Sequence, residues 1–149
     1  MFNFVKRAAK AVSREAAAEY GQNKDFLEGV CAAAALVSAA DGEIEDAERT
    51  KVIAVISGHK TLGAIYSQND IQTVADEMFK RAKDGSGRIQ LARELDDVRS
   101  KPNGRHMAED IYAIARDIAS ADGEVEPKEQ EVLAKIASRL QVDPKAFDF

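Results

Sequence analysis

Apolar residues recur at helical spacing along most of the chain, and this pattern predicts an all-α fold. Side chains three and four residues apart share one face of a helix, so stripes at that spacing indicate helices with one buried face. No segment shows a convincing strand pattern. We expect about seven to eight helices, built around stripes at 27–37, 52–56, 71–79, 89–98, 107–118 and 133–140, with a short helical turn over 60–66.

Turn-forming residues separate the stripes and predict where helices begin. The segments 84–87 and 101–104 are rich in Gly, Asp, Asn, Ser or Pro and interrupt the helical pattern. Ser67 or Asn69 is expected to cap one helix, and Ser86 the next. These short polar side chains can accept hydrogen bonds from the free amides of a first helical turn.

A six-residue segment occurs twice and relates two parts of the chain. Residues 40–45 (ADGEIE) recur as 121–126 (ADGEVE), 81 residues later. Each copy predicts a hairpin of two helices joined by a tight turn of about four residues, over about 24–57 and 105–140. Flanking positions stay in phase and are expected to face the core: Val30 with Ile111, Val37 with Ile118, Val52 with Leu133, and Val55 with Ile136.

The turns themselves contain residues with defined backbone and packing roles. Gly42 and Gly123 are expected to end the first helix of each hairpin in a left-handed conformation. Ile44 and Val125 are expected to pack into the core. Pro127 suits the first position of a helix, where its missing N–H has no partner to lose.

Composition and charge indicate one soluble domain that spans 1–149. Apolar residues make up 45% and charged residues 32%, which is ordinary for a globular protein. The net charge of −5 gives little support for nucleic-acid binding, so no nucleic-acid partner is expected. The segment 80–105 has 8 basic and 4 acidic residues, whereas 109–149 has 10 acidic and 5 basic, which predicts a polarised surface.

Cysteine usage and hydropathy predict a cytoplasmic protein. Cys31 is the single cysteine, so no internal disulfide can form, and we expect it to be a small buried core residue. No apolar run approaches the ~20 residues that a membrane span needs. The first residues lack the long apolar segment of a secretory signal.

The first 20 residues predict an additional amphipathic helix with aromatic and basic side chains. Such a helix is typical of contact with a membrane surface or a partner protein. Docking of its phenylalanines on the protein's own core is the alternative. At the other end, 143–147 is expected to form a capped turn that docks Phe147 or Phe149 on the core. The candidate partner- or membrane-binding residues at the start are Phe2, Phe4, Lys6, Arg7 and Lys10.

Each repeated turn gathers four carboxylates within eight residues. Such groups repel one another unless solvent or a cation screens them, and hard cations such as Ca²⁺, Mg²⁺ or Mn²⁺ prefer oxygen ligands. An EF-hand is excluded, because its first two ligand positions would fall on Val37 and Ala39. The candidate ligands for a divalent cation are Asp41, Glu43, Glu45 and Glu48 in the first turn and Asp122, Glu124, Glu126 and Glu129 in the second.

Helix capping is the alternative explanation of the same acids. If Glu45 and Glu126 are N-caps, Glu48 and Glu129 fall at the third helical position, where glutamate forms half of a capping box. Capping alone leaves one fact unexplained, because glutamate is not a preferred N-cap residue and yet occupies that position twice. Two hypotheses therefore stand: the acids only cap helices, or they cap helices and also bind a cation or a partner.

Catalysis is not expected from this sequence. His59 and His106 are isolated and form no zinc pattern or Cys/His pair. No nucleophile, base and orienting group can be recognised together. We therefore expect a binding module and not an enzyme.

The duplicated Ala-Asp-Gly-Glu-Ile/Val-Glu turn, with a glutamate seven residues after its aspartate, resembles the TerB-like tellurite-resistance family. It is also similar to the helical domain at the N-terminus of membrane-anchored DjlA-type co-chaperones. The resemblance covers nearly the whole chain, through the ending at 143–147. Glu45 and Glu126 depart from the pattern, since Ser, Thr or Asp is expected at the cap. By position, the resemblance assigns metal binding to Asp41, Glu48, Asp122 and Glu129.

The resemblance implies two related helical halves and a role in bacterial resistance to tellurite and other chemical stress. It also implies association with membrane-bound resistance proteins, which would place a cytoplasmic protein at the inner face of the membrane with peripheral contact. We expect a monomer or weak dimer that acts as an interaction module and binds a cation through its acidic turns. A metal-free scaffold that docks on a membrane protein through its basic faces is the alternative.

Overall fold

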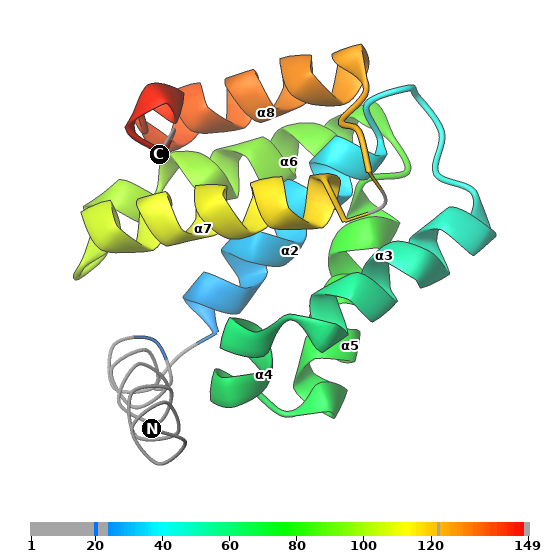
Figure 1. The fold of residues 1–149 in the computed structure, drawn as a ribbon, viewed down its shortest axis with the longest axis horizontal. Coiled ribbons are helices and arrows are strands. Elements are labelled where there is room, and N and C mark those ends of the chain that lie inside the picture. Colours follow the sequence, from blue (N-terminus) through cyan, green and yellow to red (C-terminus); the bar gives the residue numbers. More distant parts are fainter. Residues whose placement is uncertain (1–19, 21–23, 122, 148–149) are drawn as a thin grey trace, which may run out of the picture.

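The structure is a computed structural model, and it describes residue 20, residues 24–121 and residues 123–147 (Figure 1). Within these ranges it has seven α-helices, two short 3-10 helices and no strand, which confirms the all-α prediction. The helix predicted over 1–20 lies outside the described residues, Tyr20 excepted. The elements are α2 (Asp25–Ser38), α3 (Asp46–Gly58), α4 (Lys60–Ile65), α5 (Gln68–Arg81), α6 (Gly85–Asp96), η1 (Val98–Ser100), α7 (Gly104–Ala119), α8 (Pro127–Leu140) and η2 (Pro144–Phe147).

Helix α2 lies at the centre, and α5, α6, α7 and α8 pack around it. It is buried on every side because alanines occupy positions 32–35 and let neighbouring helices approach closely. Gly29 shows how close α7 comes, since a Cβ there would lie 2.5 Å from Ile111 Cδ1. Cys31 is fully buried in this helix, as expected.

Both copies of the repeated segment lie in helix–turn–helix structures, but the turns are longer than predicted. The connections run over 39–45 and 120–126, seven residues each in place of about four. Helix α2 ends at Ser38 and α7 at Ala119, so neither glycine ends a helix. Gly42 and Gly123 instead have φ of 101° and 121° in an extra turn beyond the helix, where a positive φ favours glycine.

The second helices of the two copies pack differently. Helix α8 lies along α6 and α7 and buries Leu133 and Ile136. Helix α3 packs mainly on α5 and buries Ile53 and Ile56. The prediction for Val52 and Val55 was therefore only partly right: both contact the core, but they are only half-buried because α3 turns its apolar face toward α5.

Helix caps confirm one prediction and correct another. The Ser67 hydroxyl accepts a hydrogen bond from the Asp70 amide at 3.1 Å, so Ser67 caps α5. At α6 the predicted cap, Ser86, is wrong: the Asp84 carboxylate accepts from the Gly87 amide at 2.7 Å. Asp84 precedes the helix with an extended backbone, whereas Ser86 already lies inside the first turn.

The turn residues and the C-terminal segment pack as predicted. Ile44 and Val125 are half-buried against the core, and Pro127 opens α8. The Asp143 carboxylate accepts from the Lys145 amide at 3.0 Å, and the Phe147 ring lies 5.4 Å from that of Tyr112. In the described part of the chain, no helix has the length and apolar character needed to cross a membrane.

Candidate functional site: an acidic pocket between the two turns

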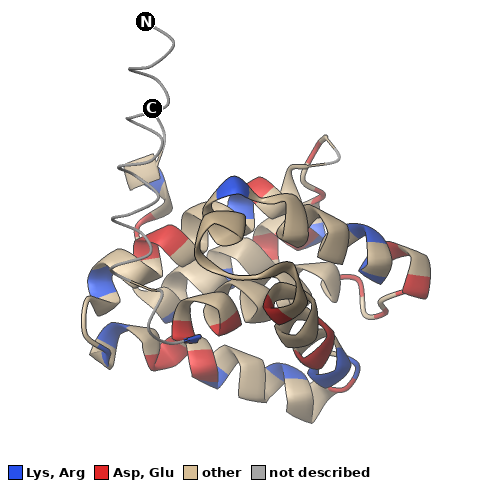
Figure 2. Cartoon of the chain, turned by 90° about the horizontal axis from the view of Figure 1, so that it is seen from below, with Lys and Arg blue, Asp and Glu red and all other residues tan. Residues whose placement is uncertain are grey.

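The two acidic turns lie at the same end of the molecule (Figures 1 and 2). Between them is a pocket of about 320 Å³, lined by residues of α2, α3, α7, α8 and the second turn. Its lining is mostly apolar, with Val37, Val52 and Ile118 among the contributors. The charged side chains on the lining are Glu48, Lys51 and Glu129.

Tertiary structure brings Glu48 and Glu129 to one pocket, although 81 residues separate them in sequence. The side chain of Glu48 is largely exposed, but partial desolvation of its carboxylate beside the pocket raises its pKa above the ordinary value. The neighbouring carboxylates raise it further, in the order Asp41, Glu129, Glu45 and Glu126. Carboxylates of both turns therefore act on a single group, which means that their negative charges converge here.

Capping explains Glu129 but does not explain Glu48. One Glu129 carboxylate oxygen accepts from the Glu126 amide at 3.0 Å, as in a capping box. At the equivalent position in α3, Glu48 has no hydrogen bond or ion pair within the described residues. The two copies thus differ, and the carboxylate of Glu48 remains available to a ligand.

The other predicted ligands are spread along the turns. Glu43 and Glu124 are exposed and do not line the pocket, and Glu45 and Glu126 precede α3 and α8 as their N-cap residues. Asp122 lies outside the described residues. So do the predicted partner-binding residues of the first segment, which are Phe2, Phe4, Lys6, Arg7 and Lys10.

The oxygen ligands that this pocket offers suit a hydrated cation better than a dehydrated one. Among the described residues, no group of three or more His, Cys, Asp or Glu side chains is arranged to hold a metal ion. The residues therefore do not fit a dehydrated ion enclosed by protein ligands. The carboxylates on the lining, Glu48 and Glu129, could serve only a hard divalent cation that keeps most of its water, as Mg²⁺ commonly does, and the Lys51 side chain lines the same pocket.

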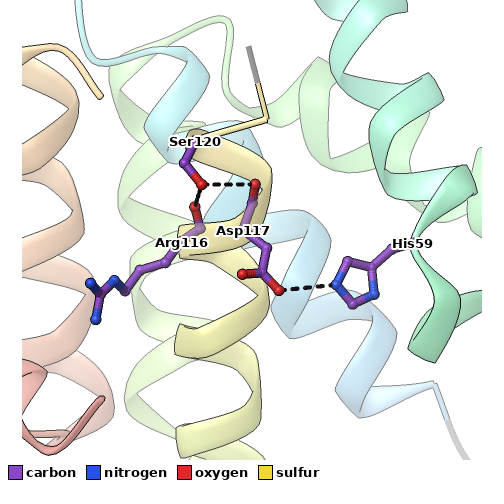
Figure 3. A network of polar contacts seen from close by, with 4 residues as sticks. All are labelled: His59, Arg116, Asp117 and Ser120. Atoms are coloured by element: carbon purple, nitrogen blue, oxygen red, sulfur yellow. Dashed lines mark hydrogen bonds and ion pairs between the residues drawn. The ribbon is translucent and has the colours of Figure 1, made fainter. Parts of the chain in front are cut away.

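A second polar contact near this end was not visible in the sequence (Figure 3). His59 Nε2 lies 3.3 Å from a carboxylate oxygen of Asp117 and links the α3–α4 junction to α7. Directly after α7, where the second turn begins, the Ser120 hydroxyl donates to the Arg116 carbonyl at 2.9 Å. Because 58 residues separate His59 from Asp117, no local spacing could have indicated the pair.

Comparison with family models matches residues 27–149 to the family described as tellurite resistance protein TerB. The chain belongs to the TerB family. This membership confirms the resemblance and links the protein to tellurite resistance. No curated protein and no solved structure matched the chain. The TerB match contains both acidic turns and the pocket between them, and it begins after the predicted first helix.

Proposed function

We propose that this TerB-family protein is a non-enzymatic interaction module of a bacterial stress- and tellurite-resistance system. Its acidic pocket binds a divalent cation, Ca²⁺, Mg²⁺ or Mn²⁺, through Glu48 and Glu129. It works with membrane-associated partners at the inner face of the membrane. The observation that supports the cation most directly is the convergence of both turns on Glu48, a carboxylate with a raised pKa and no capping role.

Electrostatics explain why this pocket would take up a cation. A divalent ion between Glu48 and Glu129 offsets the repulsion that helps to raise the Glu48 pKa. The Glu126 amide keeps its hydrogen bond to one Glu129 carboxylate oxygen, and the other oxygen is left for the ion. Surrounding carboxylates such as Asp41 add attraction without direct contact. The remaining ligand positions are filled by water, which matches a weakly held ion.

The loose packing of α3 would allow cation binding to change the surface that a partner contacts. Val52 and Val55 are half-buried in the pocket wall, so α3 is not fully packed against α7 on this side. An ion that attracts Glu48 toward Glu129 would pull α3 toward α8 and close the pocket. The exposed surface of α3 and of both turns would then differ between the two states, and a partner could distinguish them.

The side chains of the described core support a binding role. Cys31 is fully buried, and burial raises its pKa to about 12, so it is not available as a thiolate nucleophile. His59 contacts Asp117, and its Nδ1 is buried without a hydrogen-bond partner in the described chain. The proposed interaction module uses neither side chain as a catalytic group.

Calorimetric titration of the full chain with Ca²⁺, Mg²⁺, Mn²⁺ and Zn²⁺ tests the cation. We expect binding of Mg²⁺, Mn²⁺ or Ca²⁺ with a dissociation constant of about 0.1–1 mM. Glu48→Gln and Glu129→Gln should each weaken it about tenfold, because each removes one of two direct charges. Glu131→Gln is the matched control, since Glu131 is an exposed acid on α8 that does not line the pocket. Absence of heat with every cation would leave the metal-free scaffold as the better description.

A further inference from the structure

A second surface lies on α6 and α8, and none of its lining residues lines the acidic pocket. The two helices run side by side (Figure 1) and leave a groove of about 400 Å³ between them. Leu36 and Ala39 at the end of α2 contribute to its floor. The apolar walls are formed by Ala92 and Leu95 of α6 and by Val132 and Ile136 of α8.

Basic side chains border this apolar groove on both sides. Arg88 lies on the α6 wall, and Lys135 and Arg139 lie on the α8 wall. On α8, Val132, Lys135 and Arg139 fall within roughly 60° of arc, so apolar and basic positions share one face. A positive groove is notable in a chain with a net charge of −5.

The local contacts of these cations leave positive charge available to a ligand. Arg88 donates to the Ala82 carbonyl at 2.9 Å, which fixes its position without neutralising it. Arg139 pairs with Asp96 at 2.8 Å, with about half of each side chain exposed. Lys135 is exposed and has no hydrogen bond or ion pair within the described residues. Three cations therefore face one acid at this groove.

An exposed apolar side chain extends the same surface. Ile89 is 53% exposed and is the one large hydrophobic residue of the described chain in that state. It lies on α6 three residues before Ala92, so the helical spacing places it beside the groove wall. Exposing an isoleucine side chain to water is unfavourable in free energy, and a docked partner would remove it from water.

We propose that this groove docks an amphipathic helix of a partner protein, with apolar side chains in the groove and acidic side chains along its edges. A groove between two neighbouring helices suits a third helix, which inserts side chains at positions i, i+3, i+4 and i+7. Charge complementarity with Arg88, Lys135 and Arg139 selects acidic flanks and opposes basic ones. The proposal does not depend on the acidic pocket or on a cation.

Selection from a displayed peptide library tests this surface directly. The library consists of 16-residue helices with a Leu, Ile, Phe or Met stripe, and the flanking positions vary among Glu, Gln and Lys. It is selected on the full chain in EDTA, which removes divalent cations. We expect enrichment of peptides with Glu at the flanks. Enrichment of Lys or Gln, or no enrichment at all, would overturn the proposal.

Three variants of the chain test whether an enriched peptide binds in this groove. Lys135→Glu should weaken it about fivefold at low ionic strength, because a rim charge is reversed. Ala92→Trp should weaken it tenfold or more, because the indole fills the groove. Lys60→Glu makes the same charge change at an exposed site on α4 and should bind like the parent chain. Thermal melting monitors the fold of each variant, and the exposed Lys135 keeps the test valid if Ala92→Trp unfolds.

Other occupants of the groove give different results. Binding to phosphatidylglycerol vesicles that Lys135→Glu abolishes, without peptide enrichment, would assign the groove to lipid. A dimer of the chain alone that Lys135→Glu dissociates in sedimentation velocity would assign it to a second copy. Either outcome overturns the proposal. Retained peptide binding by Glu48→Gln would show that the groove acts separately from the acidic pocket, whichever way the cation titration turns out.

Discussion

At the scale of single residues, Glu48 is where the charges of both turns meet. Its pKa is raised chiefly by partial burial and then by Asp41 and Glu129. A carboxyl with a higher pKa in the folded state than in the unfolded state opposes folding when it is ionised. The fold is therefore relatively stabilised below the unfolded-state pKa of Glu48, and this advantage is lost as pH rises through the raised value.

Glu48→Gln should raise the melting temperature at pH 7, because the amide removes an ionised group that the fold disfavours. The difference from the parent chain should disappear below about pH 4, where the carboxyl is protonated in both states. Thermal unfolding followed by circular dichroism between pH 3 and 8, without divalent cations, measures this. Glu131→Gln, which changes an exposed acid of α8 outside the pocket, should show no such rise. A lower melting temperature for Glu48→Gln at pH 7 would contradict the prediction.

At the scale of elements, the start of α6 shows how a cap and a close approach act together. Asp84 accepts from the Gly87 amide and so caps the first turn of α6, which packs closely against the end of α5. A Cβ at Gly87 would lie 1.7 Å from the Arg81 carbonyl oxygen, so only glycine fits. At Gly85, two residues earlier, a Cβ would meet nothing within 4 Å.

Gly87→Ala should lower the free energy of unfolding by about 2–3 kcal/mol, because the methyl group overlaps backbone that cannot move independently. Gly85→Ala adds the same methyl group to the same helix without a clash, so its effect should stay within about 1 kcal/mol and favour folding. Urea denaturation of both variants measures the difference. Equal stability of the two variants would show that α5 and α6 are not packed as described.

At the scale of the whole molecule, α2 decides which surfaces meet. Its alanines allow α5, α6 and α7 to approach from several sides. The turns that follow α2 and α7 thereby reach the same end of the molecule, where the acidic pocket lies. The C-terminal end of α2 also contributes to the groove between α6 and α8. One buried helix thus positions both proposed surfaces.

Ala33→Leu should destabilise the whole fold by about 1–3 kcal/mol, because Ala33 is fully buried and added carbons must displace neighbouring helices. The control is Ala64→Leu, at an exposed position on α4, which should change the free energy of unfolding by at most about 0.5 kcal/mol. Guanidinium denaturation followed at 222 nm measures both. Equal changes in the free energy of unfolding for the two variants would contradict close packing around α2.

Features set by neighbouring residues were predictable from the sequence. The helical stripes, the Ser67 cap and Pro127 at the start of α8 all depend on residues close together in the chain. The docking of Phe147 was predicted from its apolar side chain, but its partner, Tyr112, is distant in the sequence. The TerB resemblance belongs here too, because it depends on a short duplicated motif. The cap of α6 was predicted wrongly, because Asp84 and Ser86 both have side-chain oxygens that could accept from the first amides of the helix. The length of the turns was also predicted wrongly.

The sequence by itself determined an all-α chain with two acidic turns and its family. Only the tertiary structure decided that Glu129 caps a helix while Glu48 does not, and that both line one pocket. The same holds for the His59–Asp117 contact and for the basic groove on α6 and α8. Spacing fixes which side chains share a face of one helix, but which faces meet depends on how all the helices pack around α2.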